Sequence, residues 1–210
     1  MKIVLKITLL SFLLSWGNLA SSSSIEADFR KTLQYLTKCA VPIMDHVSSL
    51  PPDLIILLLG DQFIPKNFQP KTQKQRKLKN ILGSQRMLIA DAHKDQVINL
   101  IDNKSGSICE RKMPTYSNRF VKDIMKKSEM ERAALISKVK NDQATYKEIS
   151  DILASEQETM EELLIYWMQK EPEAMVKVEK IFEQNAQLGS DLVNASAKLV
   201  KVLESEFGIK

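Results

Sequence analysis

The stretch from Thr145 to Phe207 constrains the fold most, because its apolar residues keep a helical spacing over most of its length. The clearest run consists of Met160, Leu163, Leu164, Trp167 and Met168. Positions i, i+3, i+4, i+7 and i+8 share one face of a helix. No segment shows a competing alternation of apolar and polar residues. The sequence therefore predicts an all-α fold, a helical bundle with a long C-terminal helix.

Helix-start signals divide this part of the chain. Thr145 and Thr159 are each followed three residues later by a glutamate, Glu148 and Glu162, which is the pattern of a capping box. The predicted helices are Asn118–Lys140, Thr145–Ala154, Met160–Lys170 and Glu173–Glu206. The heptad-like stripe of the last helix favours packing against a partner helix or self-association.

The front part begins with a predicted helix over residues 24–48, which Pro42 kinks or ends. A second helix is expected from the apolar run Leu54–Leu59. Asp53 is predicted to cap its start and Gly60 to stop it. At this length the run is typical of a buried core helix, not of a membrane span.

A Pro-rich basic linker is predicted at about residues 61–77, followed by a helix from Leu78 to Ile101. A boundary is predicted near Pro114, and it separates a helical N-terminal region (22–113) from a C-terminal domain (114–210).

The N-terminus has the composition of a secretory signal peptide. Lys2 and Lys6 flank the start of an apolar run, residues 7–16, which is followed by small residues. The run is too short to span a bilayer comfortably. We expect a signal peptide over residues 1–21, cleaved between Ala20 and Ser22, and a secreted, extracellular protein. An uncleaved anchor is the alternative.

Cys39 and Cys109 are the only cysteines. In a secreted chain an even pair predicts one disulfide. It would close a loop of about seventy residues, which the chain-entropy model values at about 4 kcal/mol. Asn103, in an Asn-Lys-Ser sequon on a loop-like segment, is a candidate glycosylation site.

Charge is distributed unevenly along a chain of net charge +4. The run Lys66–Lys79 is basic and contains no acid, whereas residues 146–206 contain thirteen acids and six lysines. The basic run is either a solvated loop and helix start or a contact for an anionic surface. Nucleic acid is not expected as a partner, because Phe68 is the only aromatic residue in the run.

Catalytic motifs are missing from the sequence. It contains no Gly-rich phosphate loop, no GxSxG and no HExxH, and its two histidines lie far apart. The sequence therefore predicts a binding or interaction protein and not an enzyme.

Several features of the C-terminal part together resemble one known family. They are the lead-in Tyr146, Ile149 and Leu153, the Thr-x-x-Glu start at Thr159, Leu163-x-x-x-Trp167, Phe182, and a long helix with Leu192, Ala195 and Val202. Over about Thr145–Glu206 the chain resembles the SXP/RAL-type secreted antigens of nematodes. This resemblance implies a secreted, all-helical domain with divalent cations as a suggested ligand.

Any cation site would have to be irregular. Residues 151–162 place Leu153 and Glu156 at the third and sixth positions, where an EF-hand loop requires an oxygen ligand and a glycine. The densest candidate ligands for Ca²⁺ or Mg²⁺ are Glu156, Glu158, Glu161 and Glu162. The same acids would also be favoured by the dipole of a helix beginning there.

A carrier of an apolar, fatty acid-like ligand is the alternative function. It would use a set of methionine and aromatic residues, because methionine adapts to irregular ligands. The set is Met160, Tyr166, Trp167, Met168, Met175 and Phe182. Otherwise these side chains form an ordinary core.

Overall fold

A computed structural model describes residues 24–102, 114–171, 173–177 and 186–208. The elements are α2 (Ser24–Ser49), α3 (Pro52–Phe63), α4 (Gln73–Gly83), η1 (Ser84–Arg86), η2 (Asp91–His93), α5 (Lys94–Ile101), α6 (Arg119–Lys140), α7 (Tyr146–Lys170) and α9 (Ala186–Phe207). The predicted all-α fold is confirmed, since these ranges contain helices and one isolated β-bridge, between Leu88 and Thr145. No helix in the described ranges is long and apolar enough to cross a membrane.

The predicted signal peptide, Cys109 and Asn103 lie outside the described residues, as does Phe182.

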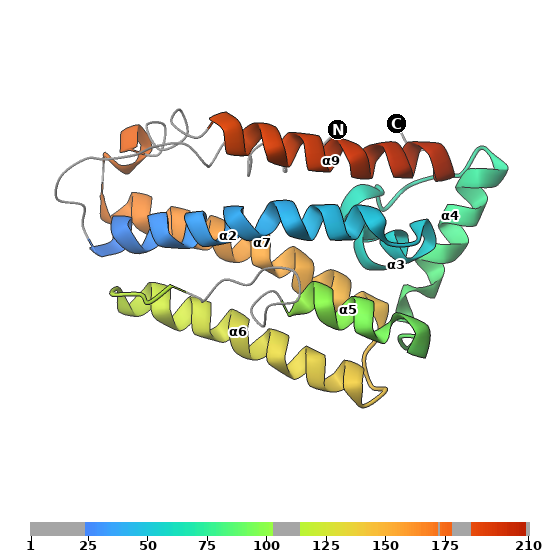
Figure 1. Cartoon of the computed structure of the whole chain (residues 1–210), viewed down its shortest axis with the longest axis horizontal. Helices are drawn as coiled ribbons and strands as arrows, with labels where there is room; N and C mark the ends of the chain where they lie inside the picture. Colours follow the sequence, from blue (N-terminus) through green and yellow to red (C-terminus); the bar gives the residue numbers. More distant parts are fainter. Residues whose placement is uncertain (1–23, 103–113, 172, 178–185, 209–210) are drawn as a thin grey trace.

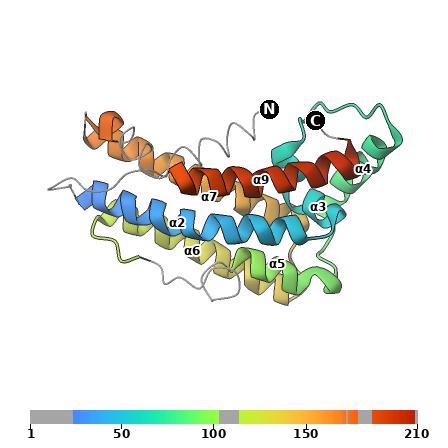
Figure 2. The same cartoon turned by 45° about the horizontal axis from the view of Figure 1, so that its top comes forward.

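The long helices α2, α6, α7 and α9 extend along the long axis of the molecule, and the short helices α3, α4 and α5 lie toward one end (Figures 1 and 2). Helix α2 packs against α9, and α7 packs against both α3 and α6. Elements from the two predicted regions therefore lie against one another.

The main core surrounds α3. Leu54, Ile55, Ile56 and Leu58 are each at most 1% exposed. A helix that is apolar over most of its surface is stable in water only when that surface is covered. The residues around it come from both sides of Pro114, among them Val97, Val139, Ile149, Leu199 and Phe207. The two predicted regions thus share one core.

A second apolar cluster lies where α2, α6 and α7 meet. Its buried members are Phe29, Val121, Met125, Leu163, Trp167 and Ala174. The rings of Phe29 and Trp167 lie 4.7 Å apart between centroids, within the range of favourable aromatic contacts.

A buried carboxylate, that of Asp28, joins α2 to the start of α6. Asp28 is fully buried and accepts hydrogen bonds from the backbone amides of Ser117 (2.6 Å) and Asn118 (2.5 Å). Asn118 in turn caps α6 by accepting from the amide of Val121. A buried acceptor of this kind is costly unless it is satisfied, so these bonds fix the position of α6 on α2.

Helix α7 is continuous, so the predicted break between Ala154 and Met160 is wrong. The capping box at Thr145 and Glu148 is confirmed, but the matching pattern at Thr159 starts no helix. The Thr159 hydroxyl instead donates to the carbonyl of Ser155, 3.0 Å away, inside the helix. Without proline or glycine in this stretch, nothing interrupts the backbone hydrogen bonds.

Two further boundaries in the front part differ from the prediction. Helix α2 continues past Pro42 to Ser49. Asp53 does not cap α3, because Pro51 is the N-cap residue and no side chain forms a capping hydrogen bond. The carboxylate of Asp53 instead forms an ion pair with the ammonium group of Lys77, with 2.9 Å between nitrogen and oxygen.

The predicted linker over 61–77 is shorter in the structure, because α3 continues to Phe63 and α4 begins at Gln73. A capping box at Thr72 and Gln75 starts α4. The predicted helix from Leu78 to Ile101 is also interrupted, by η1, an extended segment and η2.

The last predicted helix is described only in pieces. Residues 174–177 are helical, and α9 covers Ala186–Phe207.

Gly60 is not a helix stop but a contact point between α3 and α4. A Cβ atom added there would lie 2.3 Å from Cδ2 of Leu82. Helices α3 and α4 can therefore approach this closely only because residue 60 has no side chain.

We predict that Gly60→Ala lowers the free energy of unfolding by about 1 kcal/mol, since overpacking outweighs the gain in helix propensity. The control Gly83→Ala adds a methyl group with no atom within 4 Å and should stabilise the protein by about 0.5 kcal/mol. Urea denaturation measures both changes. Equal effects of the two substitutions would contradict close packing at Gly60.

The disulfide stays a prediction. Cys39 is buried in α2 beside Tyr35 and Ile43, and no free cysteine occurs among the described residues. Peptide mapping without reduction should yield a cross-linked peptide that contains Cys39 and Cys109. Alkylation of both thiols in the native, unreduced protein would show that no bridge forms.

Candidate functional site

The predicted acidic cluster lies in the middle of α7. Three of its four members are exposed there: Glu158, Glu161 and Glu162. The side chain of the fourth, Glu156, is not among those that the structure describes. Because α7 begins at Tyr146, the dipole of a helix N-terminus does not explain these acids. Within the part of the chain that the structure describes, no group of three or more His, Cys, Asp or Glu side chains could hold a metal ion.

The predicted methionine and aromatic set is divided by the structure. Trp167 is fully buried and Met168 packs against the cluster around it. Tyr166 stacks on Phe120, with 3.8 Å between ring centroids. Met175 is 52% exposed, so its expected place in the core is wrong. The members that are buried thus pack against protein side chains.

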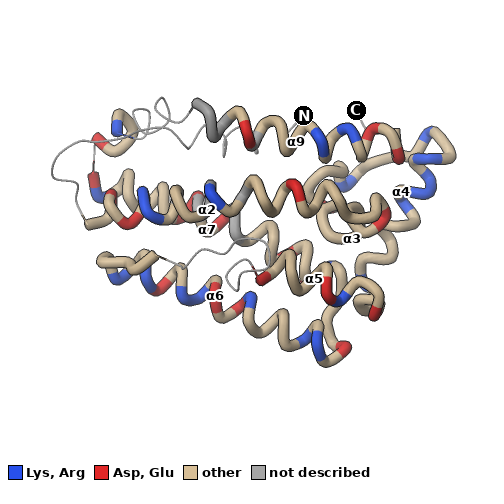
Figure 3. Tube along the Cα trace, in the orientation of Figure 1, with Lys and Arg blue, Asp and Glu red and all other residues tan. Residues whose placement is uncertain are grey.

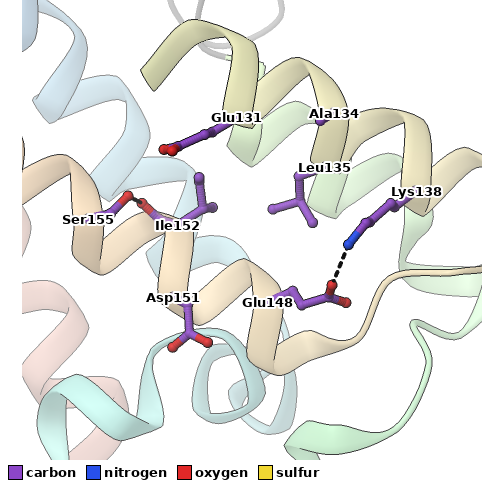
Figure 4. A pocket seen from close by; sticks show the side chains of 8 residues that line it. All are labelled: Glu131, Ala134, Leu135, Lys138, Glu148, Asp151, Ile152 and Ser155. Carbon is purple, nitrogen blue, oxygen red and sulfur yellow. Dashed lines mark hydrogen bonds and ion pairs between the residues drawn. The ribbon is translucent and has the colours of Figure 1, made fainter. Parts of the chain in front are cut away.

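An open cleft of about 380 Å³ lies between α6 and α7 (Figure 4). Leu135, Ala134 and Ile152 give it apolar walls, and charged side chains surround them. Lys138 of α6 and Glu148 of α7 form an ion pair of 2.8 Å on its border. An open cleft with a charged border differs from the enclosed apolar pocket that a fatty-acid carrier needs.

Glu148 links this border to the start of α7. Its carboxylate accepts from Lys138 and from the backbone amide of Thr145, and these bonds hold the pKa of Glu148 below its ordinary value. The pair is partly exposed, so solvent screens it and its contribution to stability is small.

A second charged surface lies on α4 and the segments that flank it. No acid occurs between Gln62 and Ala90, and every basic side chain in this stretch is exposed. We call this set the basic end: Lys66, Lys71, Lys74, Arg76, Lys77, Lys79 and Arg86. Figure 3 shows lysine and arginine gathered on α4 and on the segment that leads into it.

Most of the basic end is electrostatically uncompensated. Lys77 pairs with Asp53, and the ammonium group of Lys74 donates to the carbonyl of Ser205 at 2.6 Å. The other five side chains form no ion pair with the residues that the structure describes. These basic groups therefore remain available to an anion.

The basic end follows from the local folding of α4. Its single buried side chain, Leu78, anchors the helix on the core, with Ile81 and Leu82 partly buried beside it. Lys79 and Arg76 occupy the other faces of the helix and are exposed. Packing of the apolar side thus directs the charged side outward.

The sequence prediction identified Lys66–Lys79 but missed Arg86 and the exposed residues Met87 and Leu88 beside it. A signal for the larger surface was present, because the acid-free stretch continues as far as Ala90.

Comparisons with known proteins add no assignment: no family model matches the chain, and neither a curated protein nor a solved structure matches it.

We predict that Glu148→Ala costs about 1 kcal/mol of stability, because it removes half of the capping box. Glu148→Gln is the matched control, since glutamine keeps the cap and loses only the charge pair with Lys138. This substitution should cost about 0.3 kcal/mol. Urea denaturation at neutral pH measures both.

The pH dependence has a definite sign. Because the pKa of Glu148 is lowered in the folded state, its charge stabilises the protein above the ordinary pKa of about 4.3. The advantage of the native protein over Glu148→Gln should therefore vanish as the pH falls through the folded-state pKa. An advantage that persists at pH values well below this range would contradict the assigned ion pair.

Proposed function

We propose that the chain is a secreted, non-catalytic helical binding protein that engages polyanions through its basic end. One observation carries the proposal: five exposed basic side chains in an acid-free stretch have no ion pair among the described residues. Sulfate or phosphate groups arrayed on a surface or along a chain would supply the missing negative charge.

The contrast with the rest of the molecule supports this proposal. Some lysines on the long helices are matched with acids from distant parts of the chain, whereas others, such as Lys122 and Lys126 on α6, are exposed and form no ion pair with the described residues. Lys147 pairs with Asp61 at 2.8 Å, and Lys198 pairs with Asp45 at 2.7 Å. The basic end differs from these helices because its stretch, residues 62–90, contains no acid, whereas acids are interspersed among the lysines of α6.

Repulsion among like charges makes such a cluster unfavourable in the isolated protein. An anionic partner relieves that repulsion, and the summed field of the cluster increases the rate of encounter with it. The same field is screened over about 8 Å at physiological salt, so binding should weaken as salt rises.

The two functions expected from the sequence receive less support. For divalent cations, the exposed glutamates of α7 form no candidate ligand group in the described residues. For an apolar ligand, Trp167 and its neighbours pack against one another. The proposal does not depend on the resemblance to SXP/RAL-type antigens.

We predict that Arg76→Glu/Lys79→Glu markedly reduces the salt concentration needed to elute the protein from immobilised heparin. The control is Lys122→Glu/Lys126→Glu on α6, which changes the net charge equally at exposed positions outside the basic end. It should elute near the native protein. Equal losses in both variants would mean that bulk charge, and not the basic end, governs retention.

A further inference from the structure

Met87 and Leu88 are two large apolar side chains exposed directly beside the basic end. They are 62% and 56% exposed, and they follow Arg86 in the chain. Exposed apolar residues are ordinary on protein surfaces, and a larger apolar patch with a polar rim marks an interaction site. Met87 and Leu88 stand out from the other adjacent exposed pair, Met175 and Val176, because they adjoin a stretch that contains no acid.

The fold holds this pair outward. The backbone carbonyl of Met87 accepts from the amide of Tyr146 at 3.3 Å, and the amide of Ile89 donates to the carbonyl of Ala144 at 3.1 Å. The amide of Ala90 donates to the Tyr146 hydroxyl at 3.1 Å. The side chain of Ile89 is buried, so the segment is attached to the core on one side and presents its other side to solvent.

Two nearby acids share one lysine as their partner. Asp91 pairs with Lys94 at 2.6 Å, and Asp142 pairs with the same ammonium group. Their negative charge is thus balanced in part within the protein. Arg86 has no ion pair among the described residues and extends the positive field of the basic end to Met87.

The basic end and the apolar pair lie at the same end of the molecule. In Figures 1 and 2, α4 and the chain that continues from it toward α5 form this end. This end of the molecule therefore combines positive charge with exposed apolar side chains. Such a combination is complementary to a partner surface that has anionic groups on the outside and an apolar layer beneath them.

Resting on the proposed function, we infer that the polyanion is an anionic lipid bilayer. Lys and Arg of the basic end contact the lipid headgroups, and Met87 and Leu88 enter the interfacial layer. Clustered basic residues are attracted to anionic headgroups, and apolar side chains at the interface add affinity. A sulfated glycan would satisfy the charges but would offer no apolar layer to Met87 and Leu88.

The test is cosedimentation of the full mature protein with vesicles of phosphatidylcholine, with and without about 30 mol% phosphatidylserine. The native protein should bind only the anionic vesicles. Met87→Gln/Leu88→Gln should weaken this binding by about tenfold while leaving heparin retention unchanged. The control Met130→Gln/Ile165→Gln replaces exposed apolar residues on α6 and α7 and should bind as the native protein does.

Each other outcome has a definite meaning once circular dichroism shows that the variants are folded. Heparin retention without vesicle binding would overturn the lipid inference and favour a sulfated glycan, leaving the proposed function intact. Vesicle binding unchanged in Met87→Gln/Leu88→Gln would overturn the insertion of the apolar pair. Absence of both heparin retention and vesicle binding would overturn the proposed function itself.

Discussion

Helix α3 is apolar over most of its surface and has to be covered there, whereas Asp53 and Asp61 near its two ends reach solvent. Leu54, Ile55, Ile56 and Leu58 cover more than half of the circumference of the helix and are all buried. Their burial requires α4, α7 and α9 to pack around α3. Gly60 lets α4 approach closely, because a larger residue would collide with Leu82. The position of the neighbouring helices thus follows from the need to cover α3.

This enclosure also creates the charged surface. Helix α4 covers α3 with one apolar side, centred on Leu78, so its lysines and arginine face solvent. The two segments on either side of α4 are anchored in the same way, by Ile64 before it and Ile89 after it, which are both buried. The basic end and the exposed pair Met87 and Leu88 are therefore presented by a supported part of the fold.

Local signals predicted much of the helix content and both ends of α6, but not every boundary. Thr145 and Thr159 carry the same capping pattern, yet only Thr145 begins a helix. Thr145 follows a turn in which Asp142 has a positive φ of 56°, whereas Thr159 is in the interior of an uninterrupted helix. A hydroxyl can satisfy either a free amide or a carbonyl one turn back, so the pattern by itself does not distinguish a helix start from a helix interior.

The sequence by itself determined the all-helical class and the cap at Thr145, because these depend on residues within about four positions of one another. It also determined the acid-free basic stretch, which is a matter of composition. Tertiary structure decided which charges pair across distant parts of the chain. Asp61 reaches Lys147 and Asp45 reaches Lys198 only because distant helices pack together. It also decided that Met87 and Leu88 are exposed while Ile89 is buried, since the contacts of residues 87–90 with residues 144–146 set that choice.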